Sequence, residues 1–223
     1  RIVRFDYGDV GVAAICFNES LLISTWLDHL LESKVIKVIS LVDCGSTDGT
    51  VQIIKAKQED YPGKILLKEV NWDKDFSSLR NLSLEPLRKL NMTWALWLDI
   101  DTFFNKNVDV LFEKLNGMML FLYNDIRVPS LRFWSLDRVM GNNVPKAEHW
   151  GLLRLSSLKG FAGNLHEQAI VESGRLELKA QDLPGFFLAH YDLAKLNKLA
   201  EAKGYSLEFV MGIKKHRYLT IRK

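Results

Sequence analysis

Cysteine is scarce in this sequence: Cys16 and Cys44 are the two found among 223 residues. Two thiols do not make a disulfide framework, and their spacing matches no metal-binding motif, so we expect both to be reduced and structural. Long apolar runs are absent as well, because no stretch approaches the roughly 20 residues that a membrane-spanning helix requires. No signal-peptide pattern opens the sequence either. These absences favour a cytoplasmic protein.

An excess of charge of either sign is also lacking. Lysine and arginine number 30 against 27 aspartates and glutamates, which gives a formal charge of +3. This imbalance is too small to indicate nucleic-acid binding. Basic residues do gather at positions 214–217 and 222–223. Such a cluster can contact an anionic membrane surface or an acidic acceptor, although a solvated tail has the same composition.

Glycine-rich phosphate-binding motifs are missing too. No Gly-x-Gly-x-x-Gly follows the first expected strand, and no Gly-x-x-x-x-Gly-Lys-Ser/Thr occurs anywhere. This speaks against a dinucleotide-binding domain and against a P-loop nucleotidase. A phosphate group would therefore have to be held by a metal ion. The length fits one large domain, 1–223, and a hydrophobic content of 48% is enough for a proper core.

Strands and helices alternate in the first half of the chain. Short apolar, β-rich runs predict strands at 10–17, 35–42, 64–70 and 94–98. Between them we expect a helix capped by Asn18, a helix at 51–57, and a helix that carries Arg80 and Asn81 and is kinked or ended by Pro86. This alternation predicts an α/β fold with a doubly wound, mostly parallel sheet and helices on both faces.

The pattern changes in the second half, which we expect to complete the same domain. A helix is predicted at 108–115 and another at 192–204, with a loop at 160–167. Strands are predicted at 119–123, 128–134, 150–155, 176–179 and 186–191. Residues 10–101 would thus form one half of the domain, and 102–223 would shape a pocket over the edge of its sheet.

Two carboxylates, Asp99 and Asp101, follow the apolar run at 94–98. Alternate residues of an extended chain point the same way, and ligands of open α/β sheets bind at the carboxyl ends of the strands. Two hard oxygen donors there suit Mg²⁺ or Mn²⁺ held together with phosphates. Asp43 ends another strand at the same edge and could accept hydrogen bonds from a nucleobase or a ribose. An aspartate-rich turn without function remains the alternative.

Six short segments of the sequence form a recognisable set. They are Ile15-Cys16-Phe17-Asn18-Glu19, 41–50 with Asp43-Cys44-Gly45-Ser46-Thr47-Asp48-Gly49-Thr50, 76–81 with Arg80-Asn81, 97–101 with Asp99-Ile100-Asp101, Asn164-Leu165-His166-Glu167, and Ala189-His190-Tyr191. Together they resemble the inverting family 2 glycosyltransferases, which have the GT-A fold. The resemblance extends from about residue 11 to residue 192, and its late segments look like the branch of lipopolysaccharide-core glucosyltransferases and peptide S-glycosyltransferases.

The resemblance implies a nucleotide-sugar donor, a UDP-sugar above all, and a Mn²⁺ or Mg²⁺ cofactor. Asp101 would bind the metal, and His190 would complete the metal shell unless it is an ordinary buried histidine. Cys44 and Thr102 depart from the family pattern, and the second acid of an Asp-x-Asp-Glu run is missing at Thr102. The residues implied in donor binding are Ala14, Phe17, Asn18, Glu19, Asp43, Ser46, Arg80, Asp99 and Ile100.

Glu167 is the predicted general base, because sugar transfer requires the acceptor to lose a proton as it attacks. Asp137 is the next candidate, and Glu167 could instead cap a helix or pair with Arg154. The acceptor would be a glycan, a lipid-linked glycan or a peptide. Two other functions remain open at this point: a nucleotidyltransferase, and a nucleotide-sugar-binding protein without catalysis.

Overall fold

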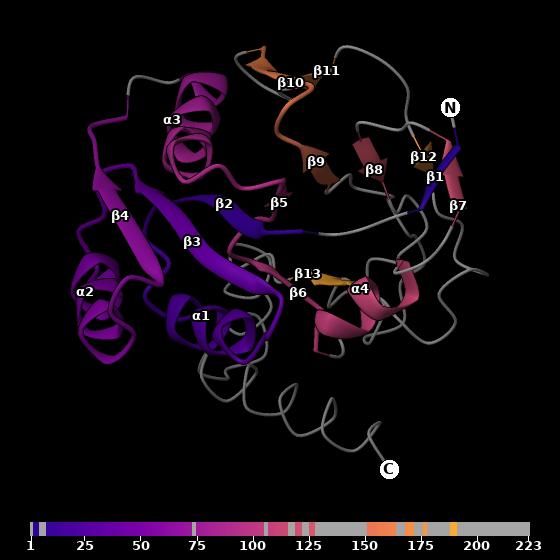
Figure 1. Cartoon of the computed structure of the whole chain (residues 1–223). Helices are drawn as coiled ribbons and strands as arrows, with labels where there is room; N and C mark the ends of the chain where they lie inside the picture. Colours follow the sequence, from indigo (N-terminus) through magenta and orange to yellow (C-terminus); the bar gives the residue numbers. More distant parts are fainter. Residues whose placement is uncertain are drawn as a thin grey trace, which may run out of the picture.

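The structure is a computed structural model of the whole chain. The residues it describes are 2–4, 8–72, 75–104, 107–115, 119–121, 125–127, 151–163, 168–171, 176–177 and 188–190. They form a mixed α/β fold in which a mostly parallel sheet is flanked by helices (Figure 1). Within this part of the chain, no helix is long and apolar enough to cross a membrane.

The central sheet has seven strands in the order β12-β8-β9-β5-β2-β3-β4. The pairs formed by β5, β2, β3 and β4 are parallel, whereas β9 runs antiparallel to both of its neighbours. The predicted mostly parallel sheet is therefore confirmed. The strand bounds are β2 Val10–Cys16, β3 Ile36–Asp43, β4 Ile65–Glu69, β5 Trp94–Trp97, β8 Asp125–Arg127, β9 Gly151–Arg154 and β12 Leu176–Glu177.

Helices cover both faces of this sheet. Helices α1 (Ile23–Leu31) and α2 (Thr50–Asp60) lie on one face, and α3 (Phe76–Lys89) lies on the other (Figure 1). The apolar stripe predicted for α1 is largely buried, because Ile23, Trp26, Leu27 and Leu30 are at most 1% exposed. Helix α4 (Asp109–Leu115) follows in the second half. The doubly wound arrangement thus follows from two separate apolar cores, one on each side of the sheet.

Strand β5 shows how the sequence divides its side chains between those cores. Trp94, Leu96 and Leu98 join the core beneath α1, while Ala95 and Trp97 pack with the core beneath α3. Side chains alternate along an extended chain, so the next residue on the α3 side is Asp99. The end of β5 therefore directs Trp97 and Asp99 toward the same helix.

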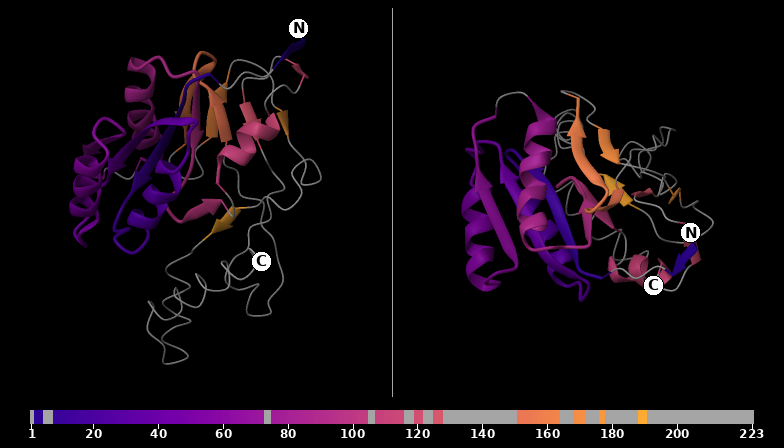
Figure 2. Two further views of the ribbon diagram at one scale, coloured as in Figure 1. Left: turned by 60° about the horizontal axis from the view of Figure 1, so that its bottom comes forward. Right: turned by 45° about the horizontal axis from the view of Figure 1, so that its top comes forward.

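Three two-stranded sheets complete the described part. Strands β10 (Leu158–Ala162) and β11 (Gln168–Val171) form an antiparallel pair, and Figure 2 shows β10 beside α3. Strand β6 (Thr102–Phe104) pairs with β13 (Leu188–His190), and β1 (Ile2–Arg4) pairs with β7 (Met119–Phe121). Of the strands predicted at 119–123, 176–179 and 186–191, residues 119–121, 176–177 and 188–190 are described and are strands, and the other residues lie outside the described part.

The prediction that Asn18 caps a helix is wrong. Helix α1 begins at Ile23, and no side chain caps its N-terminus. Asn18 instead has a positive φ of 54°, and its side-chain oxygen accepts a hydrogen bond from the Thr47 backbone N–H at 2.9 Å. A partner distant in the sequence takes the oxygen that a cap would have used.

Helix α3 does not end at Pro86, and it continues to Lys89. Buried Leu84 and Leu87 hold this last turn against the sheet, and Arg88 donates hydrogen bonds to the Leu155 and Leu158 carbonyls at 3.1 and 2.6 Å. Proline removes one backbone donor, and these tertiary contacts offset that loss.

The predicted loop at 160–167 is also partly wrong, because β10 extends through Ala162. The Phe161 backbone is held by the Asn81 side chain in two hydrogen bonds, and no local sequence pattern predicts this contact. The strand predicted at 128–134 and the helix at 192–204 lie outside the described residues, as do residues 164–167.

Candidate active site

A pocket of about 420 Å³ opens at the carboxyl ends of β2, β3 and β5. This is the edge at which the sequence predicted ligand binding. Six of the predicted site residues line it, whereas Ala14, Asn18, Asp43 and Ser46 lie outside its lining. The lining residues are Ile15, Cys16, Phe17, Glu19, Cys44, Trp72, Phe76, Arg80, Asp99, Ile100 and Asp101.

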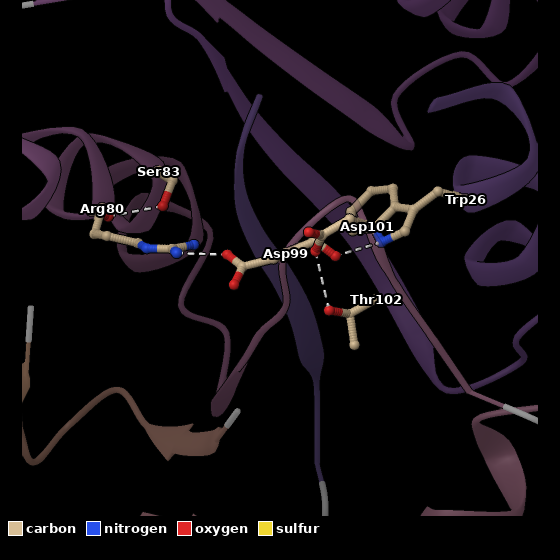
Figure 3. Close-up of polar contacts among 6 residues, drawn as sticks. All are labelled: Trp26, Arg80, Ser83, Asp99, Asp101 and Thr102. Carbon is tan, nitrogen blue, oxygen red and sulfur yellow. Dashed lines mark hydrogen bonds and ion pairs between the residues drawn. The ribbon is translucent and has the colours of Figure 1, made fainter. Parts of the chain in front are cut away.

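The turn after β5 is fixed by its backbone and presents its side chains to the pocket. The Asp99 carbonyl accepts hydrogen bonds from the Trp26 indole N–H at 3.0 Å and from the Thr102 N–H at 3.1 Å. The Asp101 carboxylate accepts a hydrogen bond from the Thr102 hydroxyl at 3.2 Å (Figure 3). An aspartate-rich turn is therefore present, and its two carboxylates still line the pocket.

Arg80 supplies the positive charge of this pocket. Its Nη2 lies 2.5 Å from Asp99 Oδ1, and its side chain is 6% exposed while that of Asp99 is 53% exposed (Figure 3). Asp75 caps the N-terminus of α3 by accepting hydrogen bonds from the Ser77 and Ser78 N–H groups. This places Arg80 in the second turn of a firmly started helix. An ion pair with one solvent-facing member can exchange its carboxylate for a phosphate at modest cost.

Glu19 contributes a partly buried carboxyl group to the pocket. One oxygen of its carboxyl group is buried without a hydrogen-bond partner in the described part of the chain. Burial, together with the negative charges of Asp101, Asp48 and Asp99, raises the pKa of Glu19 to about 7. The pocket therefore has a negative potential near Asp101 that favours a proton or a cation.

This geometry predicts that Glu19→Gln stabilises the metal-free protein above neutral pH. The folded state holds the Glu19 proton more tightly than the unfolded chain, whose glutamates titrate near 4.5. Stability is therefore lost as pH rises from about 4.5 toward 7. We expect the variant to gain about 1–3 kcal/mol at about pH 8 and little at about pH 4. Urea unfolding at both pH values measures this difference.

Glu59→Gln is the matched control, because Glu59 is exposed on α2, away from the pocket. Its stability should follow the wild-type pH profile. A Glu19→Gln profile that runs parallel to the wild type across this range would contradict the placement of the carboxyl group.

The loops after β2 and β3 are hydrogen-bonded to each other beside the pocket. The Asn18 N–H donates to the Ser46 hydroxyl at 2.8 Å, and the Thr47 N–H donates back to Asn18. The Asp43 carboxylate, 1% exposed, accepts from the Gly45 N–H, the Ser46 N–H and the Ser46 hydroxyl at 2.5–3.0 Å. Asp43 thus organises the turn after β3, and its contact with a nucleobase stays a prediction.

The same two loops are joined a second time nearer the helices. The Glu19 N–H donates to the Thr50 hydroxyl at 2.8 Å, and the Ser20 N–H donates to the Asp48 carboxylate at 3.0 Å. Partial burial alone would raise the pKa of Asp48, but hydrogen bonds from Thr50 and Ser20 outweigh it and lower the pKa to about 2. The backbone of 17–19 is therefore well ordered beside the pocket.

An aromatic wall faces the charged residues, and sequence reasoning missed most of it. The Trp72 ring centroid lies 6.3 Å from that of Phe17 and 5.3 Å from that of Phe76. Phe17 and Trp72 are 48% and 43% exposed, which is unusual for large apolar side chains. Trp72 and Phe76 flank the sequence Asp73-Lys74-Asp75, and this flanking is the signal in the sequence that could have indicated them.

Both cysteines are free and buried, as expected, and both line the pocket. Burial raises the pKa of the Cys16 thiol well above its ordinary range, and the nearby Asp43 charge raises it further. Cys16 is therefore an unreactive wall residue and not a nucleophile.

The residues present fit a divalent cation that is bound jointly with a substrate. Among the described side chains, no three histidines, cysteines, aspartates or glutamates form a metal site by themselves. Mg²⁺ and similar ions usually take one or two protein carboxylates and complete their shell with water and substrate phosphates. Asp99 and Asp101 supply such carboxylates in one pocket.

His190 and Glu167 are the two remaining predicted site residues. The pairing of β13 with β6 sets His190 opposite Thr102, the residue after Asp101. Its position in the strand register is thus next to the predicted metal ligand. Glu167, the predicted base, lies outside the described residues.

Comparisons with known proteins bear on the fold. No protein-family model and no curated protein matches the sequence. Among solved structures, the mannosyltransferase PcManGT from Pyrobaculum calidifontis, in complex with GDP-Man and Mn²⁺, aligns over 70% of this chain and 48% of its own, with 20% identity and a TM-score of 0.53. The two share the GT-A-type fold.

Weaker likenesses are found to TarS 1–349 from S. aureus and to glucosyl-3-phosphoglycerate synthase from Mycobacterium tuberculosis. The first has 18% identity and a TM-score of 0.46 over 62% of this chain, and the second has 14% identity and a TM-score of 0.42 over 68%. The chain spans between 38% and 59% of the length of these three proteins.

Proposed function

We propose that this protein is a metal-dependent, inverting glycosyltransferase that takes a sugar from a nucleotide-diphosphate donor, most readily a UDP-sugar. The observation that supports this best is the composition of the pocket. Two carboxylates, Asp99 and Asp101, share it with the guanidinium of Arg80 and with an aromatic wall. A nucleotide sugar offers a diphosphate for the charged side and flat rings for the aromatic side.

Each charged residue has a role in holding the donor. Asp101 would bind Mn²⁺ or Mg²⁺ together with the donor phosphates, with His190 as a further ligand. The cation would neutralise charge that develops on the leaving diphosphate. Arg80 would contact the diphosphate or the uridine, and Asp99 would hold the ribose or a metal-bound water. The mannosyltransferase that shares this fold was solved with a nucleotide sugar and Mn²⁺, which is consistent with such a site.

The acceptor side completes the proposal. Glu167 would remove the proton of the attacking group, and attack opposite the leaving diphosphate would invert the anomeric centre. The acceptor would be a glycan, a lipid-linked glycan or a peptide. We further propose that the whole chain is one domain, that the protein acts in the cytoplasm, and that the basic residues at 214–217 allow peripheral contact with a membrane.

A donor-turnover assay tests this function directly. UDP-, GDP- and dTDP-sugars are incubated with the protein and Mn²⁺ or Mg²⁺, and release of the nucleoside diphosphate is measured with and without EDTA. We expect release from one donor class, dependent on the metal. Binding without release would indicate a non-catalytic binding protein, and pyrophosphate formation from a nucleoside triphosphate and a sugar phosphate would indicate a nucleotidyltransferase.

A further inference from the structure

The guanidinium of Arg80 is held from two directions at the wall of the pocket. Asp99 Oδ1 accepts a hydrogen bond from its Nη2 at 2.5 Å. The indole of Trp97 lies against it on another side, with the guanidinium carbon 4.8 Å from the ring centroid. A planar cation over an aromatic face, close to a carboxylate, has few orientations open to it.

Trp97 is itself held by a ring contact with Phe161. It is the last residue of β5, and its ring centroid lies 4.8 Å from that of Phe161 on β10, at an interplanar angle of 72°. Such edge-to-face packing restricts rotation of both rings. The orientation of Trp97 therefore depends on where β10 places Phe161.

Phe161 is tied in turn to α3. Its backbone N–H donates to Asn81 Oδ1 at 2.8 Å, and its carbonyl accepts from Asn81 Nδ2 at 3.1 Å. The preceding residue, Gly160, has a φ of +151°, and a Cβ there would lie 2.7 Å from Asn81 Oδ1. Glycine is thus required for the amide to approach the strand this closely.

These contacts close a ring, because Asn81 is the residue after Arg80 on the same helix. The ring runs from Arg80 to Trp97, to Phe161, to Asn81 and back to Arg80 through the chain. It joins α3, β5 and β10, and the Arg80–Asp99 ion pair connects it to the pocket.

We propose that Trp97 and Asn81 are positioning residues that orient the Arg80 guanidinium for the diphosphate of the donor. This inference rests on the proposed function, because it assigns the ring to a site that binds a nucleoside diphosphate. Arginine has a long side chain that loses much rotational freedom when it binds an anion. A ring that fixes the side chain beforehand reduces that loss on binding.

The test compares UDP binding by calorimetry, in the presence of Mn²⁺, for Trp97→Leu, Trp97→Phe, Arg80→Met and the double variant Trp97→Leu/Arg80→Met. We expect Trp97→Leu to weaken binding about tenfold, and Trp97→Phe, which keeps an aromatic face, to weaken it about threefold or less. In the Arg80→Met background, Trp97→Leu should have no further effect. Asn81→Leu should behave as Trp97→Leu does.

Arg88→Met is the structural control. Arg88 holds the same part of the chain through the Leu155 and Leu158 carbonyls. Its loss should lower the unfolding temperature and leave UDP affinity within about twofold of the wild type. Unchanged UDP binding in Trp97→Leu, or an equal loss with and without Arg80, would overturn the proposal.

A second measurement needs no ligand and separates this inference from the proposed function. Exchange of the Arg80 guanidinium protons, followed by ¹⁵N NMR and assigned with Arg80→Lys, should be several-fold faster in Trp97→Leu than in the wild type. An unchanged exchange rate would overturn the positioning role. If the wild type binds no nucleoside diphosphate while this exchange difference is present, the proposed function fails and the restraint on Arg80 stands.

Discussion

Asp101→Asn is expected to lower metal-dependent sugar transfer by about a thousandfold, since metal coordination supplies several kcal/mol of transition-state stabilisation. The carboxylate lines the pocket beside Asp99, and its charge is one of those that raise the pKa of Glu19. An amide keeps the size of the side chain and removes the negative charge that a hard cation prefers. Release of nucleoside diphosphate as a function of Mn²⁺ concentration measures the loss. The metal concentration for half-maximal rate should rise together with the fall in rate.

The fold should tolerate this change. The Asp101 carboxylate accepts a hydrogen bond from the neighbouring Thr102 hydroxyl at 3.2 Å, while the turn itself is held by the Asp99 carbonyl. We therefore expect stability within about 1 kcal/mol of the wild type. Asp60→Asn, at the exposed end of α2, is the matched control and should leave both rate and metal dependence unchanged. Wild-type metal dependence in Asp101→Asn would remove this residue from the metal site.

Asp99→Asn should distinguish the role of Asp99 from that of Asp101, because Asp99 forms an ion pair with a buried arginine. Loss of the Asp99 charge removes the carboxylate that Arg80 binds inside the wall of the pocket. The two residues sit in one short turn but have different partners, which is why the pattern Asp-x-Asp alone does not distinguish their roles.

The sheet could be predicted from the sequence because buried parallel strands appear as continuous apolar runs. Residues 94–98 have this pattern, residues 35–42 have it apart from Lys37 and Ser40, and each run is followed by an aspartate that marks the carboxyl edge. The site followed from the same information, because topology alone brings such strand ends together. Asp99 and Asp101 follow from this pattern, Arg80 follows from the family resemblance, and all three line one pocket.

The errors have a common physical cause in long-range side-chain contacts. Asn18 looks like a helix cap, yet its oxygen is taken by Thr47, 29 residues away. Gly160 looks like a loop residue, yet it belongs to a strand because Asn81, 80 residues from Phe161, holds the next backbone unit. Local patterns describe what a residue can do, and the tertiary partner decides which of those options is used.

The aromatic wall also shows that local sequence patterns do not predict which residues meet at a site. Phe17 lies in a segment that carries the family resemblance, whereas Trp72 and Phe76 stand outside the predicted site residues. The convergence of the three rings in one pocket, with Phe17 and Trp72 left about half exposed, is what indicates a ligand surface. Trp97 is similar, since its contact with Arg80 depends on the side of β5 that faces α3.

Glu167→Gln is expected to lower transfer by about a hundredfold to ten-thousandfold, the range that general-base catalysis contributes. The amide keeps the shape of the side chain but does not accept a proton from the acceptor. Donor binding should stay within about twofold of the wild type, because the base acts on the acceptor and the donor is held by the pocket at the sheet edge. Transfer kinetics and UDP calorimetry on the same preparation provide both values.

Asp137→Asn is the control that decides between the two candidate bases. If Glu167 is the base, Asp137→Asn keeps near-normal transfer, and the pH–rate profile of the wild type loses its acidic limb in Glu167→Gln. Near-normal turnover in Glu167→Gln with a large loss in Asp137→Asn would move the role to Asp137. The prediction favours Glu167, because it follows a glycine-containing segment and stands next to His166, where the family branch that the sequence resembles carries its His-Glu pair.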